Sequence, residues 1–169
     1  MRQHRCCLHG QPQLTCCRAP GLSVLDLGSG SGRDCYAAAA LVGEKGRVTG
    51  VDMTAEQLVT ARKYNESFCK ELGYSACNLE FVEGYIEKLS DAGIKPDSYD
   101  LVISNCVVNL SPDKRSVLRE VYKALKVGGE FYFSDVYCDR RLPKHVQVFL
   151  AVTRTFPLLC FLRPGPVPQ

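Results

Sequence analysis

From residue 23 onward, short apolar runs alternate with longer segments whose apolar residues recur every three or four positions. The short runs predict β-strands near residues 23–27, 47–52, 78–83, 99–104 and 130–136. The longer segments predict helices near residues 33–42, 55–72 and 113–126, and Gly128 and Gly129 are expected to end the last helix. This alternation is typical of an α/β fold, in which a parallel sheet carries helices on both faces.

The two ends of the chain lack this alternation. Residues 1–21 hold four of the ten cysteines and show no periodic pattern, and the last residues are rich in proline. We therefore predict one folded domain over residues 22–142. A poorly ordered, cysteine-rich segment over residues 1–21 precedes it, and an apolar, proline-rich tail over residues 143–169 follows it.

The junction between the first predicted strand and the first predicted helix holds the most informative motif. Gly28, Gly30 and Gly32 alternate there, so the backbone can approach a ligand closely and turn into the N-terminus of the helix. A dinucleotide fingerprint needs a glycine at its sixth position, where the two possible frames place Arg33 and Cys35. The loop is therefore typical of a nucleotide-type binding site, and its spacing disfavours NAD as the ligand.

Composition narrows the function classes. A length of 169 residues, with 46% hydrophobic and 23% charged residues, is ordinary for one soluble domain. The net charge of +3 is small and spread along the chain, so neither nucleic acid nor a membrane surface is an expected partner. The first residues show no signal-peptide pattern, and no apolar run is long enough to span a bilayer. We predict a cytoplasmic protein.

Ten cysteines are many for a chain of this length. In a reducing compartment they are expected to bind soft metals or to react, rather than to form a disulfide framework. The N-terminal cysteines form two adjacent pairs, Cys6 with Cys7 and Cys16 with Cys17, which differ from the spacing of structural zinc sites. The favoured interpretation of these four cysteines is therefore that they are unordered thiols that have no ligand.

The glycine loop resembles motif I of the methyltransferases that use S-adenosylmethionine (AdoMet). The resemblance rests on an acidic residue followed by alternating glycines, and it implies a Rossmann-like class I methyltransferase fold with AdoMet as cofactor. The residues that it assigns to cofactor binding in this loop are Asp26, Gly28, Ser29, Gly30 and Gly32.

Residues that follow the second and third predicted strands fit the same ligand, because parallel strands bring their carboxyl ends to one edge of the sheet. Asp52 is placed to accept from both ribose hydroxyls, and Met53 would lie against the adenine. Ile86 would cover the other adenine face, and Glu87 would accept from the exocyclic amine. Alternatively, Asp52 caps the next helix, and Glu87 is a favourable first-turn residue of a helix.

The fourth predicted strand is followed by Asn105, Cys106 and Val107. Asn105 would lie beside the methionine portion of AdoMet, and Val107 also belongs to the predicted cofactor site. A thiol at Cys106 is expected to point towards the methyl acceptor. A buried cysteine that serves only as a small hydrophobic residue is the alternative.

Several segments together resemble the animal arsenite methyltransferases over residues 22–143. They include Leu-Asp-Leu-Gly-Ser-Gly-Ser-Gly-Arg-Asp-Cys-Tyr, Gly-Tyr-Ile-Glu-Lys-Leu and Ser-Asn-Cys-Val-Val-Asn-Leu. The resemblance implies that Cys106 is a catalytic residue and an arsenic ligand. It also implies a trivalent arsenic substrate, bound as a thiol complex, and a thiol reductant as partner. Trivalent arsenic is soft, and its lone pair can attack a methyl group.

Outside residues 22–143 the chain departs from this family. Cys16, Cys17 and Cys160 have flanking residues that do not match, so no arsenic-binding role is assigned to them. The family's later strands and C-terminal domain have no counterpart in the residues that follow, and we expect a sheet that is incomplete after its fifth strand. Three alternatives stay open: a carbon or oxygen methyltransferase for a small metabolite, a non-catalytic AdoMet-binding fragment, and a thiol-rich metal buffer.

Overall fold

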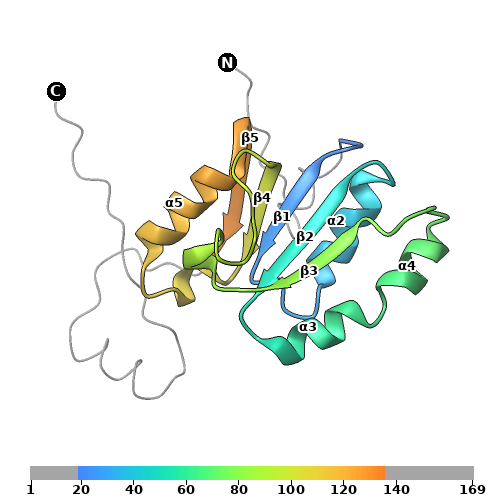
Figure 1. Ribbon diagram of the computed structural model, residues 1–169, viewed down its shortest axis with the longest axis horizontal. Helices are drawn as coiled ribbons and strands as arrows, with labels where there is room; N and C mark the ends of the chain where they lie inside the picture. Colours follow the sequence, from blue (N-terminus) through green and yellow to red (C-terminus); the bar gives the residue numbers. More distant parts are fainter. Residues whose placement is uncertain (1–18, 136–169) are drawn as a thin grey trace.

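The computed structural model describes residues 19–135, which form a parallel sheet flanked by helices (Figure 1). The strands are β1 (Ser23–Leu27), β2 (Arg47–Asp52), β3 (Leu79–Glu83), β4 (Tyr99–Asn105) and β5 (Leu125–Ser134). The helices are α2 (Arg33–Val42), α3 (Ala55–Arg62), α4 (Asn65–Glu71) and α5 (Lys114–Ala124), with short 3-10 turns η1 (Ile86–Lys88) and η2 (Val108–Leu110). Our expectations for residues 1–18 and 136–169 lie outside the described residues.

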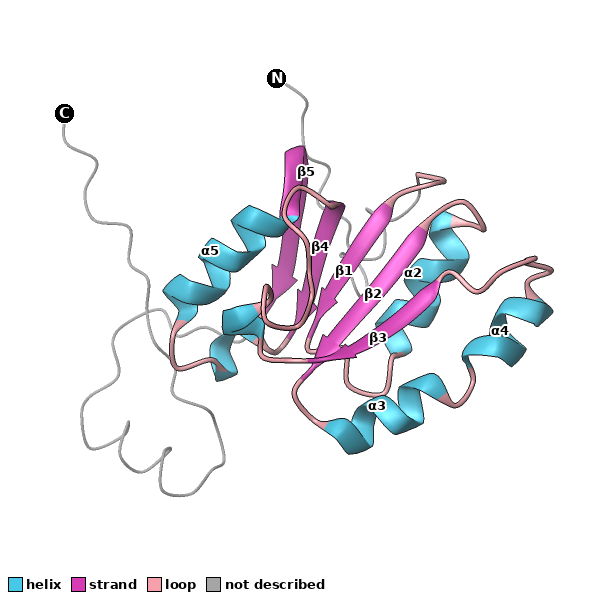
Figure 2. Cartoon of the chain, viewed as in Figure 1, coloured by secondary structure: helices cyan, strands magenta, loops and turns pink. Residues whose placement is uncertain are grey.

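The sheet has the strand order β3-β2-β1-β4-β5, and all its neighbouring strands are parallel. The chain moves outward from β1 to β3 and then returns to the other side of β1 to add β4 and β5. The strand order therefore reverses between β1 and β4, where ligands bind in open α/β sheets. Figure 2 shows the strand arrowheads at one common edge, next to this reversal point. The predicted α/β class with a parallel sheet is confirmed.

The central strands of the sheet, β1, β2 and β4, are buried on both faces. Val24 of β1 lies in a core cluster with residues of α2 and α3, among them Ala38 and Leu58. The next residue, Leu25, lies in a second cluster with Val117 of α5. Successive side chains of a strand point to opposite faces, so these two clusters are the two sides of the sheet. The predicted placement of helices on both faces is confirmed.

Local sequence explains where two of the helices begin and end. Four consecutive alanines in α2 are strong helix formers, and Gly32 and Gly43, both with positive φ, flank that helix. In α5, the Asp113 carboxylate accepts from the backbone N–H of Ser116 at 3.1 Å, which is an N-terminal cap. No helix in residues 19–135 is both long enough and apolar enough to cross a membrane.

The single helix predicted over residues 55–72 is wrong, because the structure divides this segment into α3 and α4. The hydroxyl of Tyr36, on α2, donates to the carbonyl oxygen of Ala61 at 2.5 Å and lies 2.9 Å from the side-chain oxygen of Asn65. In a continuous helix, the Ala61 carbonyl would accept from the N–H of Asn65. The hydrogen bond from Tyr36 therefore occupies the Ala61 carbonyl, which a continuous helix would need as an acceptor.

The predicted end of the last helix at Gly128 and Gly129 is also wrong. Helix α5 ends at Ala124, and β5 begins at the next residue and runs through both glycines. The pairing with β4 moves from Leu125 directly to Glu130, so both glycines lie in an irregular bulge, where Gly128 has a φ of 82°. Glycine breaks the regularity of a strand here instead of stopping a helix.

Candidate functional site

Two cavities open at the carboxyl edge of the sheet, between the loops that follow β1 to β4. The first has a volume of about 620 Å³ and is mainly apolar, and its lining includes Met53, Tyr85, Ile86, Glu87, Val107 and Leu110. The second has a volume of about 440 Å³ and is mainly polar, and its lining includes Asp26, Ser29, Gly30, Asp34, Gln57 and Asn105. Both are lined by Gly28, Asp52 and Thr54, so they form one site with an apolar end and a polar end.

The first two glycines of the loop after β1 have different roles. Gly28 has a φ of 72°, and a Cβ there would meet the Val107 side chain at 2.4 Å, so the absence of a side chain permits close packing within the protein. Gly30 has a φ of 52°, and a Cβ there would have no atom of residues 19–135 within 4 Å. Because Gly30 lines the polar cavity, the space beside it is available to a ligand.

Asp52 joins two of the loops at this edge. One carboxylate oxygen accepts from the N–H of Gly30 at 2.8 Å, and the other accepts from the N–H of Thr54 at 2.8 Å. Neither of these bonds goes to a first-turn N–H of α3, so the role of Asp52 is not confined to capping that helix. A carboxylate has about four acceptor positions, which leaves capacity for hydroxyl donors of a ligand.

Asp26 is a buried acid in the lining of the polar cavity, with 3% of its surface exposed. Burial raises the pKa of its carboxyl from 3.8 to about 7, although a hydrogen bond from the Cys35 thiol at 3.2 Å favours the ionised form. The charges of Asp34 and Asp52 add to the rise. Burial, together with the Asp26 charge, holds the pKa of Cys35 well above its usual range, so this thiol stays protonated and donates.

The raised pKa of Asp26 predicts a pH-dependent stability. The folded chain binds this proton more tightly than the unfolded chain, so the free energy of unfolding falls as pH rises from about 4 to about 7. We expect Asp26→Asn to remove this loss and to be more stable than the wild type by about 2–4 kcal/mol at pH 8, with little difference at pH 4. Urea unfolding of both proteins at the two pH values measures this, and an equal difference at both pH values would contradict it.

At the apolar end, Met53 and Tyr85 are 65% and 62% exposed, which is high for large side chains. Ile86 lies beside them in η1 and is buried. Glu87 accepts from the Ser111 hydroxyl at 2.5 Å, so its carboxylate is already oriented within the lining. The structure therefore brings together the residues predicted to contact an adenine.

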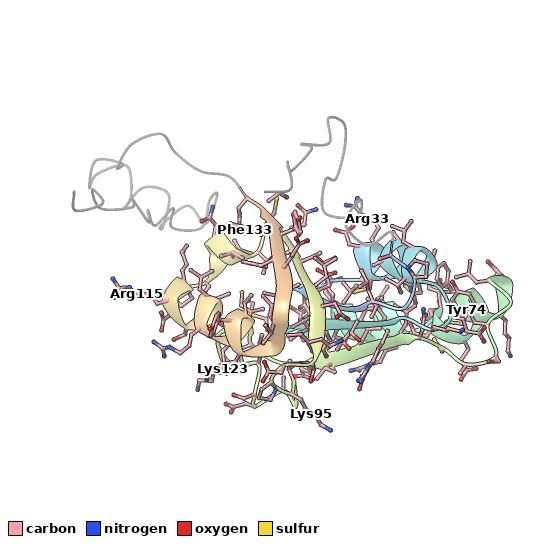
Figure 3. All side chains as sticks on the ribbon, turned by 90° about the horizontal axis from the view of Figure 1, so that it is seen from above. Arg33, Tyr74, Lys95, Arg115, Lys123 and Phe133 are labelled. Carbon is pink, nitrogen blue, oxygen red and sulfur yellow. The ribbon has the colours of Figure 1, made fainter. Side chains whose placement is uncertain are left out.

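At the polar end, the Ser29 hydroxyl is buried and has no hydrogen-bond partner among the described residues. A buried hydroxyl without a partner is costly, so this atom is a candidate for a ligand contact. Asn105 also lines this cavity, where its amide donates to Asp34 at 3.5 Å and accepts from the Ser134 hydroxyl at 2.8 Å. Arg33, at the start of α2, extends to the surface beside these residues (Figure 3).

Cys106 lies between Asn105, which lines the polar cavity, and Val107, which lines the apolar cavity. Its side chain is exposed and the lining of neither cavity includes Cys106, so the predicted approach of its thiol to a methyl acceptor stays a prediction. Its φ of 57° is left-handed, and its N–H donates to the Ser134 carbonyl at 2.8 Å. This strained turn at the end of β4 leaves the thiol at the rim of the site.

The structure adds lining residues that our sequence reasoning missed. Tyr85 directly precedes Ile86, and the rule that pointed to residues after β3 could have found it. Ser111 and Pro112 come from the segment before α5, for which no sequence motif exists. Only the fold brings that segment to the cavity.

Comparisons with known proteins agree with this geometry. A family model described as a methyltransferase domain matches residues 18–151. The human arsenite methyltransferase is 57% identical over 124 residues, which are 73% of this chain and 33% of that protein. The arsenite methyltransferase of Aquipseudomonas alcaligenes is 58% identical over 127 residues, which are 75% of this chain and 36% of the bacterial protein. The chain thus spans about a third of the length of these relatives.

A solved structure shows the same arrangement. The crystal structure of an arsenic(III) S-adenosylmethionine methyltransferase from Chlamydomonas reinhardtii superimposes with a TM-score of 0.77 at 57% identity, over 79% of this chain and 44% of that one. The matching family model covers most of the chain, including every strand of the sheet and both cavities. The chain therefore belongs to the methyltransferase domain family.

Proposed function

We propose that this chain binds AdoMet across the two joined cavities and transfers the AdoMet methyl group to trivalent arsenic held by Cys106. The proposal that AdoMet binds here rests on the position of Asp52, whose carboxylate lines both the apolar and the polar cavity. AdoMet has an apolar adenine, a ribose with two hydroxyls and a charged amino-acid end, in that order. The site offers matching groups in the same order.

The residues fit this cofactor at each of its parts. Met53 and Ile86 would cover the adenine, and Glu87 would accept from its exocyclic amine, although it shares that carboxylate with Ser111. Asp52 would bind the ribose hydroxyls through its remaining acceptor positions. Gly30 allows the loop backbone to approach the ligand, Gly28 allows Val107 to pack against that loop, and Gly32 is the N-cap of α2.

The amino-acid end of AdoMet would occupy the polar cavity. The buried Ser29 hydroxyl would gain the hydrogen-bond partner that it lacks among residues 19–135. Asp26 would face the ammonium group, and a cation there would favour the ionised form of this acid. Asn105 would lie beside the sulfonium, and Val107 would close the junction against Gly28.

AdoMet supplies a methyl group bonded to a positively charged sulfur, which is a good leaving group. Cys106, as a thiolate, would hold trivalent arsenic at the rim of the cavities and within reach of that methyl group. Arsenic brings its own lone pair to the new carbon bond, so the chain needs no general base. The contribution of the protein is to position the two reactants in line.

Two further components follow from this chemistry. The other arsenic ligands would come with a small-thiol complex. Arsenic gives its lone pair to the methyl group, and a thiol reductant would restore the trivalent state. We place the protein in the cytoplasm, where such thiols stay reduced.

Arsenic speciation tests this proposal. The wild-type chain is incubated with AdoMet, arsenite and glutathione, and methylated arsenic is measured by chromatography with mass spectrometric detection of arsenic. We expect methylated products that increase with protein concentration. If the full-length human relative forms them under the same conditions and this chain forms none, methyl transfer to arsenic is rejected for this chain.

A further inference from the structure

A pair of cysteines lies away from the cofactor site. Cys69 is in α4, Cys77 is in the loop between α4 and β3, and their sulfur atoms are 2.7 Å apart. Figure 1 shows α4 beside the loop that leads into β3, at the opposite end of the sheet from the arrowheads. Tyr74, in the same loop, is labelled at this end of the molecule in Figure 3. Neither cysteine lines a cavity of the candidate site.

We propose that Cys69 and Cys77 are a reversible oxidation site, which forms a disulfide by exchange with a small oxidised thiol such as glutathione disulfide. The two sulfur atoms need to approach by less than 1 Å to reach the bond length of about 2.05 Å. The two thiols are already in direct contact, so their approach needs no rearrangement of the sheet. This inference is independent of the proposed methyl transfer.

The surroundings hold both cysteines in place. The Cys69 backbone carbonyl accepts from the N–H of Tyr74 at 3.0 Å, which folds the loop back onto α4. The Cys77 thiol donates to the Asn65 carbonyl at 3.5 Å. The Asn78 side chain donates to the Gly43 carbonyl at 3.0 Å and so ties the loop to the end of α2. The pairing of the two thiols is therefore part of an anchored loop.

Differences in exposure set the order of the exchange. Cys77 is exposed and Cys69 is only 3% exposed, so the Cys77 thiolate meets the external disulfide first. It attacks one sulfur, releases one small thiol and leaves a mixed disulfide on Cys77. Cys69 then attacks the Cys77 sulfur and releases the second small thiol. Two protein thiols lose two electrons and two protons, and one small disulfide is reduced to two thiols.

The second step is expected to be the slower one at neutral pH. Burial and the hydrogen bond with Cys77 raise the pKa of Cys69 from 9.0 to about 11, so little thiolate is present. The rate of disulfide closure therefore rises with pH above neutrality. Once formed, the bond joins α4 to the segment that enters β3 and restricts the unfolded chain.

Peptide mapping of the oxidised full chain tests the proposal. Lys70 lies between the two cysteines, so trypsin separates them into peptides 64–70 and 71–88. The wild-type protein is treated with glutathione disulfide, its remaining thiols are alkylated, and the digest is examined by mass spectrometry. We expect these two peptides to be linked, and the link to disappear after reduction. Stable glutathione on Cys77 without the link, or a link to another cysteine, overturns the proposal.

Thermal unfolding gives a second readout. We expect oxidation to raise the Tm of the wild type by about 5 °C or more, because the bond constrains the unfolded chain. Cys77→Ser should fold, since the side chain is exposed, and should lose this rise. Cys106→Ser is the matched control, because Cys106 is also exposed but has no part in the pair, and it should keep the rise. Equal behaviour of the two variants would also overturn the proposal.

Discussion

Replacing Asp52 with alanine is expected to weaken AdoMet binding by about 100-fold to 10,000-fold. The carboxylate would lose two hydrogen bonds to the ribose hydroxyls, each contributing about 1.5–3 kcal/mol for a charged acceptor. The variant would also lose the bond that orients the N–H of Gly30, so the glycine loop would be less well positioned for the ligand. Isothermal titration calorimetry of the wild type and the variant measures the change in Kd.

The control for Asp52→Ala must separate binding from stability. Asp113→Ala also removes a carboxylate, and it removes the cap of α5, which is expected to lower the stability of the chain modestly. Asp113 lines neither cavity, so this variant should bind AdoMet as the wild type does. If Asp52→Ala binds AdoMet with the wild-type Kd, the ribose assignment is wrong.

The second large effect is expected at Cys106. Cys106→Ser should lower the rate of methylated arsenic formation by at least about 1,000-fold, because a hydroxyl is a poor ligand for a soft ion and the reactants are no longer held together. Its AdoMet Kd should change by less than about two-fold, since the thiol lies outside the lining of both cavities. Arsenic speciation measures the first quantity and calorimetry measures the second.

Cys77→Ser is the matched control for this variant. Cys77 is an exposed thiol, as Cys106 is, but it lies beside α4 at the other end of the sheet. We expect Cys77→Ser to form methylated arsenic at the wild-type rate under reducing conditions. Formation of methylated arsenic by Cys106→Ser at that same rate would reject Cys106 as the arsenic ligand.

Most of the sheet could be predicted because its central strands, β1, β2 and β4, are buried on both faces. Runs such as Val24 to Leu27 read as nearly continuous apolar segments, and Gly28 marks where the strand ends. The division between α3 and α4 could not be predicted, because it depends on a hydroxyl from Tyr36, which is distant in sequence. The start of β5 was also missed, since a strand that follows a helix without a loop leaves no turn residues to mark it.

Some residues of the candidate site could likewise be predicted from the sequence and others could not. Asp52, Ile86 and Asn105 could be predicted, because each follows or ends a strand and parallel strands share one carboxyl edge. The backbone conformation of Cys106 could not, because its left-handed φ depends on a contact with Ser134 of β5. The pairing of Cys69 with Cys77 was also not predicted. Cys77 lies outside α4, and only the fold of the loop after that helix brings the two thiols together.

Isothermal titration calorimetry of the folded wild-type chain with AdoMet tests the central claim that the two joined cavities form a cofactor site. We expect saturable binding at one site, and its loss in Gly30→Val, whose side chain would enter space that is open in the polar cavity. Gly73→Val carries the same strain, since Gly73 has a φ of 75° and open space around it, but it lies after α4 and should keep binding. No binding by the folded wild type, or equal binding by both variants, would contradict the account.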